Sequence, residues 1–531
     1  MEISVLCALF AVSLVIRATA LSNLVASPDE LTYASRAIYI LGDHWGWPAF
    51  TMWDQPPLFE YLLALMTVVF GATLDTLRLV SVFFGSLAVV AGYYLGKSLY
   101  GRTAGWVAAA TIAVNPFQIL YSRQIYIEST VSTIILFAVL LFWEGVVKNR
   151  SLKVAALGGI VFGLALDSKY ITLVMTVAML VFLVLYRKRI PGGFPRRELL
   201  VYFSVGFAMF VPVVLDLAVN NVNPFYFDLV GRFQLHGATA GGIGRVLGSG
   251  GEGGLIIYIG FRNFIQTFFR FSSVNPVAAY SASVVDIPVW VVVAIFVFVF
   301  FVGSFLFRRN PREGMLLILF IAFLGFAFSY PGKRTYFTLY PMLIFVVMLG
   351  GLVQICADKI GHRERLDTRT ILAVCLVGLT ATGIAINAFG VPVTQKAGFG
   401  DWDEITPIVS YINLNHTPNS YVAINLELIG YYLAKDNVNV SIAWMDQEQY
   451  YYSESPSNQS IQSIQQGQYP LYRVISLSVV EIEKPQFVVI PTSYYTLTPV
   501  AFRDYLSENY FEPLNTAHIL LFQIRATNGT G

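Results

Sequence analysis

Two adjacent acidic residues, Asp29 and Glu30, lie a few positions beyond the first long apolar segment of the chain. A carboxylate held at the surface of a membrane could take a proton from a hydroxyl group as a general base. The preceding Ser27 and Pro28 are typical of a helix start, so capping a helix is the alternative role of the acidic pair. The two roles are compatible, because a position in the first turn of a helix holds a carboxylate rigidly.

The composition of the 531-residue chain is that of a membrane protein, since 56% of its residues are hydrophobic and only 12% are charged. Soluble domains usually contain about 25% charged residues. Apolar runs recur along the chain, and we count about eleven that could be membrane spans. The sequence therefore predicts a mostly α, polytopic membrane protein. The net charge of +2 and the lack of a basic tail give no indication of nucleic-acid binding.

Basic residues gather in alternate connections between the apolar runs, including the segments YRKRIPGGFPRRE, FRRNPRE and DKIGHRERLDTR. The positive-inside rule assigns such connections to the cytoplasm. The N-terminus is then expected inside, and a retained first span is favoured over a cleaved signal peptide. Residues 22–75, residues 220–283 and the tail from residue 390 are expected outside.

The chain divides by composition into a membrane domain over residues 1–389 and an external α/β domain over residues 390–531. In the tail, strand-like runs such as SYVAINLEL and QFVVIPTSY alternate with helix-like runs such as DEITPIVSYI and AFRDYLSENY. Four Asn-x-Ser/Thr sequons agree with an external location. They begin at Asn415, Asn439, Asn458 and Asn528.

The first external loop, residues 22–75, contains the run WDQPPLFEYLLALMTVVFG. This run is too short to be an obvious span, and it predicts an interfacial helix that begins at Pro57, with Trp47 and Trp53 at the depth of the lipid headgroups. We therefore expect the first loop to lie along the membrane as two amphipathic helices.

Basic side chains lie near the expected external ends of several spans. Charges at such depths are costly and usually functional, and Arg and Lys bind phosphate oxygens strongly. The alternatives are snorkelling of each side chain toward the headgroups, or ion pairing, for instance of Lys169 with Asp167. Several cations on one external face favour a phosphate site. The residues concerned are Arg78, Arg123, Lys169, Lys333 and Arg334.

The three cysteines and the five histidines show no metal-ligand spacing. His44 and His236 are expected outside and could contact a substrate, although ordinary surface roles are favoured. The glycine-rich segment 241–254 follows no predicted strand, so a nucleotide site is not expected there. A flexible external loop is the preferred interpretation, and a mobile lid is the alternative.

Several segments resemble the GT-C superfamily of membrane glycosyltransferases. They are PDELTYASRAIYILGD, DQPPLFEYLL and TLRLVSVFFGSLAVVAGYYLGKSLYGRTAGWVAAATIAVNP, with LYSRQIYIEST, GLALDSKYITL and YPGKRTYFTLYPMLI further along. The most similar branch contains the protein O-mannosyltransferases and the aminoarabinose transferases. The family often has an aspartate a few residues after Ser-Arg, where this chain has Glu128 after Ser122 and Arg123. The Trp-Trp-Asp motif is absent from the chain and the first external loop contains no Asp-x-Asp motif, which argues against the oligosaccharyltransferase branch.

The resemblance implies that residues 1–389 form a catalytic domain that moves a sugar from a dolichyl- or polyprenyl-phosphate to a protein, glycan or lipid acceptor on the external face, with inversion. Asp29 would be the base, Glu30 would support it, and Glu128 is the further catalytic candidate. No cofactor is certain, and a divalent cation beside Asp29 and Glu30 is compatible with this interpretation. The donor would be bound by Arg78, Arg123, Lys169, Lys333, Arg334, Tyr336, Asp54 and His44.

Two other functions remain open on the sequence alone. A transporter or lipid-carrier flippase often shows internal repeats and broken helices near the membrane midplane, and no clear repeat is visible here. A glycan-binding membrane anchor would use the tail alone, and the carboxylates would then only cap helices. A site at the external ends of the spans favours transfer, whereas a midplane site between two similar halves favours transport.

The expected topology can be tested with single cysteines at positions Ser151 and Ser457 in a variant that lacks Cys7, Cys356 and Cys375. A membrane-impermeant thiol reagent added to intact cells should label position 457 and leave position 151 unlabelled, because the basic connection that contains position 151 is expected inside. Labelling of position 151 without position 457 would reverse the topology.

Overall fold

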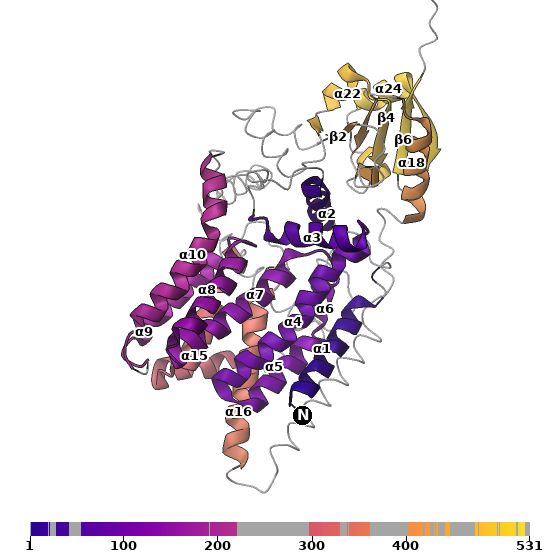
Figure 1. The fold of residues 1–531 in the computed structure, drawn as a ribbon. Coiled ribbons are helices and arrows are strands. Elements are labelled where there is room, and N and C mark those ends of the chain that lie inside the picture. The colour runs from indigo at the N-terminus through magenta and orange to yellow at the C-terminus, as the bar shows by residue number, and fades with distance from the viewer. Residues whose placement is uncertain are drawn as a thin grey trace, which may run out of the picture. The chain divides into compact units, whose positions relative to one another are not determined.

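The computed structural model describes the helices and strands that are drawn as coloured ribbons in Figure 1. The described residues are 2–19, 21, 28–41, 55–190, 192–219, 297–329, 337, 339–361, 402–417, 420–424, 429–430, 432–433, 441–445, 473–475, 477–495, 498, 500–516 and 519–525. The chain divides into two compact units. The first is built from apolar helices, and the second comprises α2, most of α3 and the C-terminal elements.

Apolar helices make up the first unit. They are α1 (Glu2–Ala18), α4 (Leu74–Tyr100), α5 (Arg102–Val114), α6 (Pro116–Ser122), α7 (Ile127–Phe142), which continues as the π-helix η2 (Trp143–Lys148), α8 (Leu152–Leu166), α9 (Thr172–Tyr186), α10 (Arg196–Val219), the π-helix η5 (Ser304–Arg308), α15 (Pro311–Ser329) and α16 (Leu339–Gly361). Within the described residues, four helices are long and apolar enough to cross a membrane. These four are Leu74–Tyr100, Ile127–Lys148, Arg196–Leu215 and Leu339–Asp358, and the expected total of about eleven spans stays a prediction.

Helix α9 has an exposed apolar face that suits a lipid environment. Its Val177, Val184 and Leu185 are exposed, whereas Met175, Met179 and Phe182 are buried. A face of large exposed apolar side chains is unfavourable in water and is stable against lipid. The described helices therefore agree with a membrane location.

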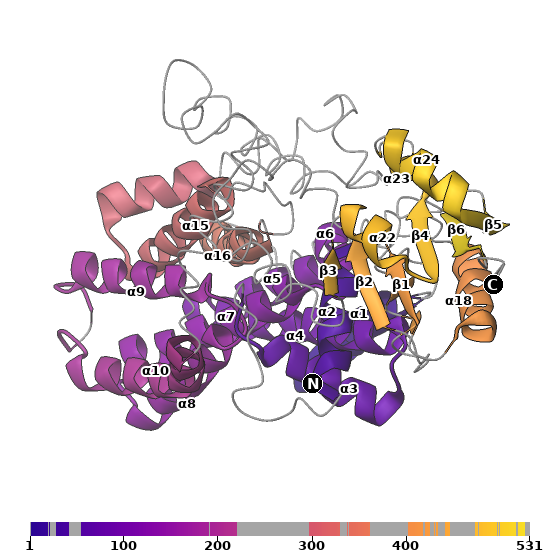
Figure 2. The ribbon, with the colours of Figure 1, turned by 90° about the horizontal axis from the view of Figure 1, so that it is seen from above.

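Helices α8 and α10 lie side by side in both views of the ribbon (Figures 1 and 2). Their contact depends on small residues: a Cβ atom added to Gly159 of α8 would lie 2.5 Å from the carbonyl oxygen of Tyr202. Helices α5 and α16 pack equally closely, because a Cβ atom added to Gly350 would lie 2.6 Å from the carbonyl oxygen of Ala104. Small residues allow helix backbones to approach closely in a membrane, where packing drives association.

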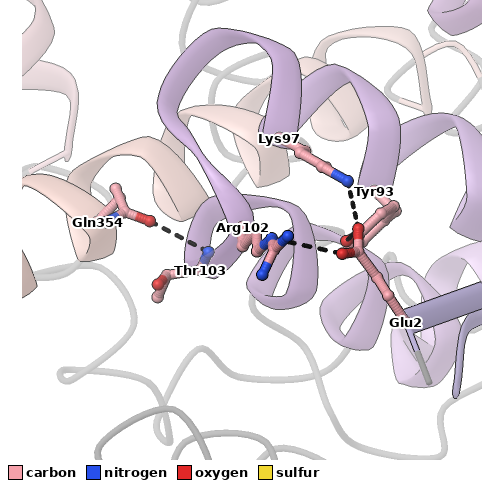
Figure 3. Close-up of polar contacts among 6 residues, drawn as sticks. All are labelled: Glu2, Tyr93, Lys97, Arg102, Thr103 and Gln354. Carbon is pink, nitrogen blue, oxygen red and sulfur yellow. Dashed lines mark hydrogen bonds and ion pairs between the residues drawn. The ribbon is translucent and has the colours of Figure 1, made fainter. Parts of the chain in front are cut away.

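Polar contacts join the first helix to its neighbours at the end that begins with Glu2 (Figure 3). The carboxylate of Glu2 accepts hydrogen bonds from the hydroxyl of Tyr93 and the ammonium of Lys97, and its Oε2 lies 3.3 Å from Nε of Arg102. These contacts connect the start of α1 with the end of α4 and the start of α5.

A second contact in the same view joins α5 to α16 (Figure 3). The backbone N–H of Thr103 donates to Oε1 of Gln354 at 3.1 Å. Thr103 lies in the first turn of α5, where backbone N–H groups have no partner inside the helix. Gln354 therefore satisfies one of these donors from another helix.

The second unit contains α2 (Pro28–Leu41), most of α3 (Leu58–Phe70) and a mixed sheet with its helices. The C-terminal elements are α18 (Trp402–Asn415), β1 (Tyr421–Ile424), β2 (Ser441–Met445), β3 (Arg473–Ile475), α22 (Leu477–Glu483), β4 (Phe487–Pro491), α23 (Thr492–Tyr495), α24 (Val500–Asn509), β5 (Tyr510–Asn515) and β6 (Ile519–Ile524). The predicted strand runs SYVAINLEL and QFVVIPTSY contain β1 and β4. That this tail is a separate external domain stays a prediction.

The sheet has the strand order β3-β2-β1-β4-β6-β5. Strands β1 to β4 are parallel, whereas β6 pairs antiparallel with both β4 and β5. The register between β5 and β6 shifts between Phe511 and Leu514. Buried Val488, Ile490 and Leu506 belong to the core between the sheet and its helices.

The close contact at Gly350 can be tested by replacing it with alanine. We expect Gly350→Ala to destabilise the protein by about 1–3 kcal/mol, because the new methyl group overlaps the backbone of Ala104 and forces α5 and α16 apart. Gly303→Ala is the matched control, since an added Cβ atom there meets nothing within 4 Å. Thermal unfolding in detergent should show a lower Tm for Gly350→Ala and an unchanged or slightly higher Tm for the control; equal effects would contradict the close packing.

Candidate active site

Asp29 and Glu30 lie in the first turn of α2. The helix begins at Pro28, as predicted, because proline has no N–H to leave unsatisfied at the first helical position. Asp29 is half-buried, whereas Glu30 has no exposed surface. Successive residues point about 100° apart on a helix, so the two carboxylates occupy different environments.

A buried ion pair stands at one end of the helices of the first unit. Glu128 in the first turn of α7 has no exposed surface, and it accepts a hydrogen bond from the ammonium of Lys169, in the turn between α8 and α9. Lys169 therefore pairs with Glu128 and not with Asp167, the partner considered from the sequence. The same ammonium lies 5.1 Å from the ring centroid of Phe337, so an aromatic face also contacts its charge.

The ion pair leaves one carboxylate oxygen for another partner. Oε2 of Glu128 is buried and forms no hydrogen bond within the part of the chain that the structure describes. Thr130 and Tyr340 likewise have buried hydroxyl groups without a hydrogen bond to any described residue. Buried polar atoms of this kind are uncommon and indicate a position that a ligand or water fills.

Asp167 is a further candidate for the site, which the sequence suggested only as an alternative partner of Lys169. It lies beyond the last residue of α8, its carbonyl oxygen accepts the N–H of Leu58 at 2.9 Å, and its Oδ1 is buried without a hydrogen bond to the described residues. Burial raises the pKa of the Asp167 carboxyl to about 7. A carboxyl group that titrates near neutral pH suits proton transfer. The only signal in the sequence was an acidic residue directly after an apolar run.

Arg78 and Arg123 contact the chain where it leaves α1. Arg78 Nη1 donates to the carbonyl oxygen of Leu21 at 2.8 Å, and Arg123 Nη2 donates to that of Thr19 at 2.7 Å. Both arginines are buried. The structure thus gives each of them a backbone partner, and their predicted contact with a lipid phosphate stays a prediction.

Five predicted site residues lie outside the described residues: His44, Asp54, Lys333, Arg334 and Tyr336. The glycine-rich segment 241–254 lies outside them as well. Among the residues that the structure does describe, no group of three or more His, Cys, Asp or Glu side chains could hold a metal ion. A cation beside Asp29 and Glu30 is therefore a matter for experiment.

Comparison with known proteins gives one family match. Residues 54–215 match the model of the dolichyl-phosphate-mannose-protein mannosyltransferase family. This segment contains the Glu128–Lys169 ion pair together with Arg78 and Arg123. No curated protein matches the chain.

Solved structures share the fold over nearly the whole chain. ArnT from Cupriavidus metallidurans, in a crystal structure with bound undecaprenyl phosphate, has 13% sequence identity and a TM-score of 0.64, covering 99% of this chain and 99% of that one. The oligosaccharyltransferase of Archaeoglobus fulgidus, tethered to an acceptor peptide with the NVT sequon, has 15% identity and a TM-score of 0.58, covering 99% and 74%. The oligosaccharyltransferase AglB of Archaeoglobus fulgidus, in complex with an inhibitory peptide and a dolichol-phosphate, has 15% identity and a TM-score of 0.53, covering 99% and 74%.

These relatives are GT-C glycosyltransferases, which agrees with the resemblance read from the sequence. At such low identity the structural likeness by itself shows the fold. Together with the mannosyltransferase family match over residues 54–215, it indicates a glycosyltransferase.

Proposed function

We propose that the protein transfers a sugar from a dolichyl- or polyprenyl-phosphate to a hydroxyl group of a protein, glycan or lipid on the external face of the membrane, with inversion. The observation that carries this proposal is the buried Glu128–Lys169 ion pair, which lies within the segment matched by the mannosyltransferase family and has a carboxylate oxygen without a hydrogen bond to any described residue. Two solved structures of similar fold, one bound to undecaprenyl phosphate and one in complex with a dolichol-phosphate, support the proposed donor.

The reaction needs a base, a cation and an acceptor hydroxyl. Asp29 takes the proton of the hydroxyl, whose oxygen then forms a bond to the anomeric carbon as the bond from that carbon to the phosphate oxygen breaks. The polyprenyl phosphate leaves with the bonding electron pair, and cationic side chains stabilise its charge. Half-buried Asp29 suits the role of the base, because its carboxylate is more accessible to an acceptor than that of the buried Glu30.

Among the residues that the structure describes, we assign Lys169 to the donor phosphate. Its ammonium is held in place by Glu128 before any donor binds, and a phosphate can take over part of this contact. Lys333 and Arg334 are assigned to the same phosphate from the sequence. Glu128, released in part from Lys169, can then accept a hydrogen bond from the sugar or the acceptor.

The transporter alternative is less well supported. A transport site is expected near the membrane midplane, where helices are broken. The Glu128–Lys169 ion pair instead joins the first turn of α7 to the turn between α8 and α9, which are helix ends.

We extend the proposal to the topology, with about eleven spans, a catalytic membrane domain over residues 1–389 and an external domain over residues 390–531.

A direct test is an assay of the purified protein with a panel of polyprenyl-phosphate sugars, each offered with hydroxyl acceptors of the protein, glycan and lipid classes. Release of the polyprenyl phosphate together with a new glycosidic bond supports the proposal. Movement of an intact polyprenyl-phosphate sugar across a vesicle membrane, without transfer, would support the flippase instead.

The role of Asp29 can be tested with Asp29→Asn. This variant keeps the side-chain size and most of the capping ability, but its amide cannot accept the proton. We expect a folded protein that binds donor normally and loses roughly 10²–10⁴-fold in kcat. Near-normal turnover in a variant with an unchanged Tm would remove Asp29 from the role of base and transfer that role to Glu128 or Glu30.

The phosphate site can be tested with Lys333→Ala and Arg334→Ala. Loss of a charge-assisted contact to the donor phosphate should weaken donor binding by about 1.5–3 kcal/mol. Lys153→Ala, in a connection that is expected inside, is the control and should leave the affinity unchanged. An unchanged Kd for a polyprenyl phosphate in both test variants would exclude Lys333 and Arg334 from the site.

A further inference from the structure

A second buried ion pair joins α2 to α3. Arg36 Nη1 lies 3.2 Å from Oε1 of Glu60, and the exposed fractions of the two side chains are 1% and 0%. Neither residue stood out in the sequence, where Arg36 looks like an ordinary polar residue of an amphipathic helix and Glu60 like the polar face of an interfacial helix. Their burial makes them as unusual as Glu128 and Lys169.

Arg36 is placed on the same face of α2 as Asp29. The two residues are seven positions apart, which is close to two full helical turns of about 3.6 residues each. Tyr33 lies between them on this face, and the guanidinium carbon of Arg36 is 5.9 Å from the centroid of its ring. Ile40, one turn beyond Arg36, is fully buried. Asp29, Tyr33, Arg36 and Ile40 thus form one stripe along α2, and the stripe meets α3 at Glu60.

A buried ion pair is a poor way to gain stability, because removing two charges from water offsets most of their attraction. It does restrict geometry strongly. The planar guanidinium binds a carboxylate in few orientations, and any rotation of α2 about its axis would separate the two charges in a place that water does not reach. The pair therefore fixes the rotation of the stripe that carries Asp29, two turns away.

We propose that Arg36 and Glu60 are positioning residues, which orient the first turn of α2 so that the Asp29 carboxylate faces the acceptor hydroxyl. This inference rests on the proposed function, in which Asp29 is the base. Arg36 and Glu60 do not contact the substrate in this role. They act through the rotation of the helix, and a small error in that rotation displaces the base from the reacting hydroxyl.

The test separates positioning from stability by removing both charges together. The double variant Arg36→Met/Glu60→Leu replaces the ion pair by apolar side chains, an exchange that buried pairs often tolerate without loss of stability. We expect a Tm close to that of the wild type, a donor Kd within about twofold and a kcat lower by about 10- to 100-fold, since a displacement of about 1 Å can reduce a rate by about 10²-fold. Tm, Kd for a polyprenyl phosphate and kcat are measured on the same preparations.

Arg36→Lys is the second variant, and it keeps the positive charge while losing the planar guanidinium. If Arg36 orients Asp29, this variant should also have a lower kcat with an unchanged donor Kd. The proposal therefore remains testable even if the double variant does not fold. Glu198→Gln is the matched control. It removes the carboxylate of another ion pair, in which Arg150 Nη1 lies 3.8 Å from Glu198 Oε2, and it should leave kcat and Kd unchanged.

Two results would overturn the inference. A wild-type kcat in the stable double variant or in Arg36→Lys would mean that the pair only fills space between α2 and α3. A weaker donor Kd with an unchanged kcat would make Arg36 a ligand of the donor. Failure of the wild-type protein to transfer any sugar would instead refute the proposed function, so the two failures are distinguishable.

Discussion

A charge persists among apolar helices only where an opposite charge or a backbone dipole meets it, and the Glu128–Lys169 ion pair is the strongest case in this protein. The carboxylate is fully buried, and its partner comes from a turn 41 residues further along the chain. Separating the two would leave a bare charge in an apolar surrounding, which costs several kcal/mol. The first turn of α7 and the turn after α8 must therefore stay together. The guanidinium groups of Arg78 and Arg123 donate hydrogen bonds to backbone carbonyl oxygens instead, and these bonds hold the chain where it leaves α1.

Those parts of the fold that depend on local rules could be predicted from the sequence. The length of an apolar run predicts a long helix such as α4 or α16, because only a helix satisfies its own backbone in lipid. Pro28 predicts the start of α2, since its ring favours the first helical position. Alternating and β-branched residues predict β1 and β4 in the same way. In each case the deciding interaction lies within a few residues along the chain.

The partners of the buried charges could not be predicted, because they depend on which helices meet. Spacing favours Asp167 as the partner of Lys169, two residues away, yet the carboxylate that the ammonium reaches belongs to Glu128. Glu60 follows a Pro-Pro pair in a segment that reads as interfacial, so its sequence context suggests exposure to water. Its complete burial against Arg36 is a property of the packed helices alone. The same limit applies to Lys333, whose assignment still rests on sequence.

The two edges of the C-terminal sheet are poorly suited to pairing with another sheet. Among the described residues, strand β3 at one edge has three residues, and strand β5 at the other contains Pro513 beside its register shift. A proline offers no N–H to a new strand, and an irregular or very short edge presents few groups in register. Many copies of this protein could therefore crowd together on one membrane without their sheets joining end to end into insoluble fibres.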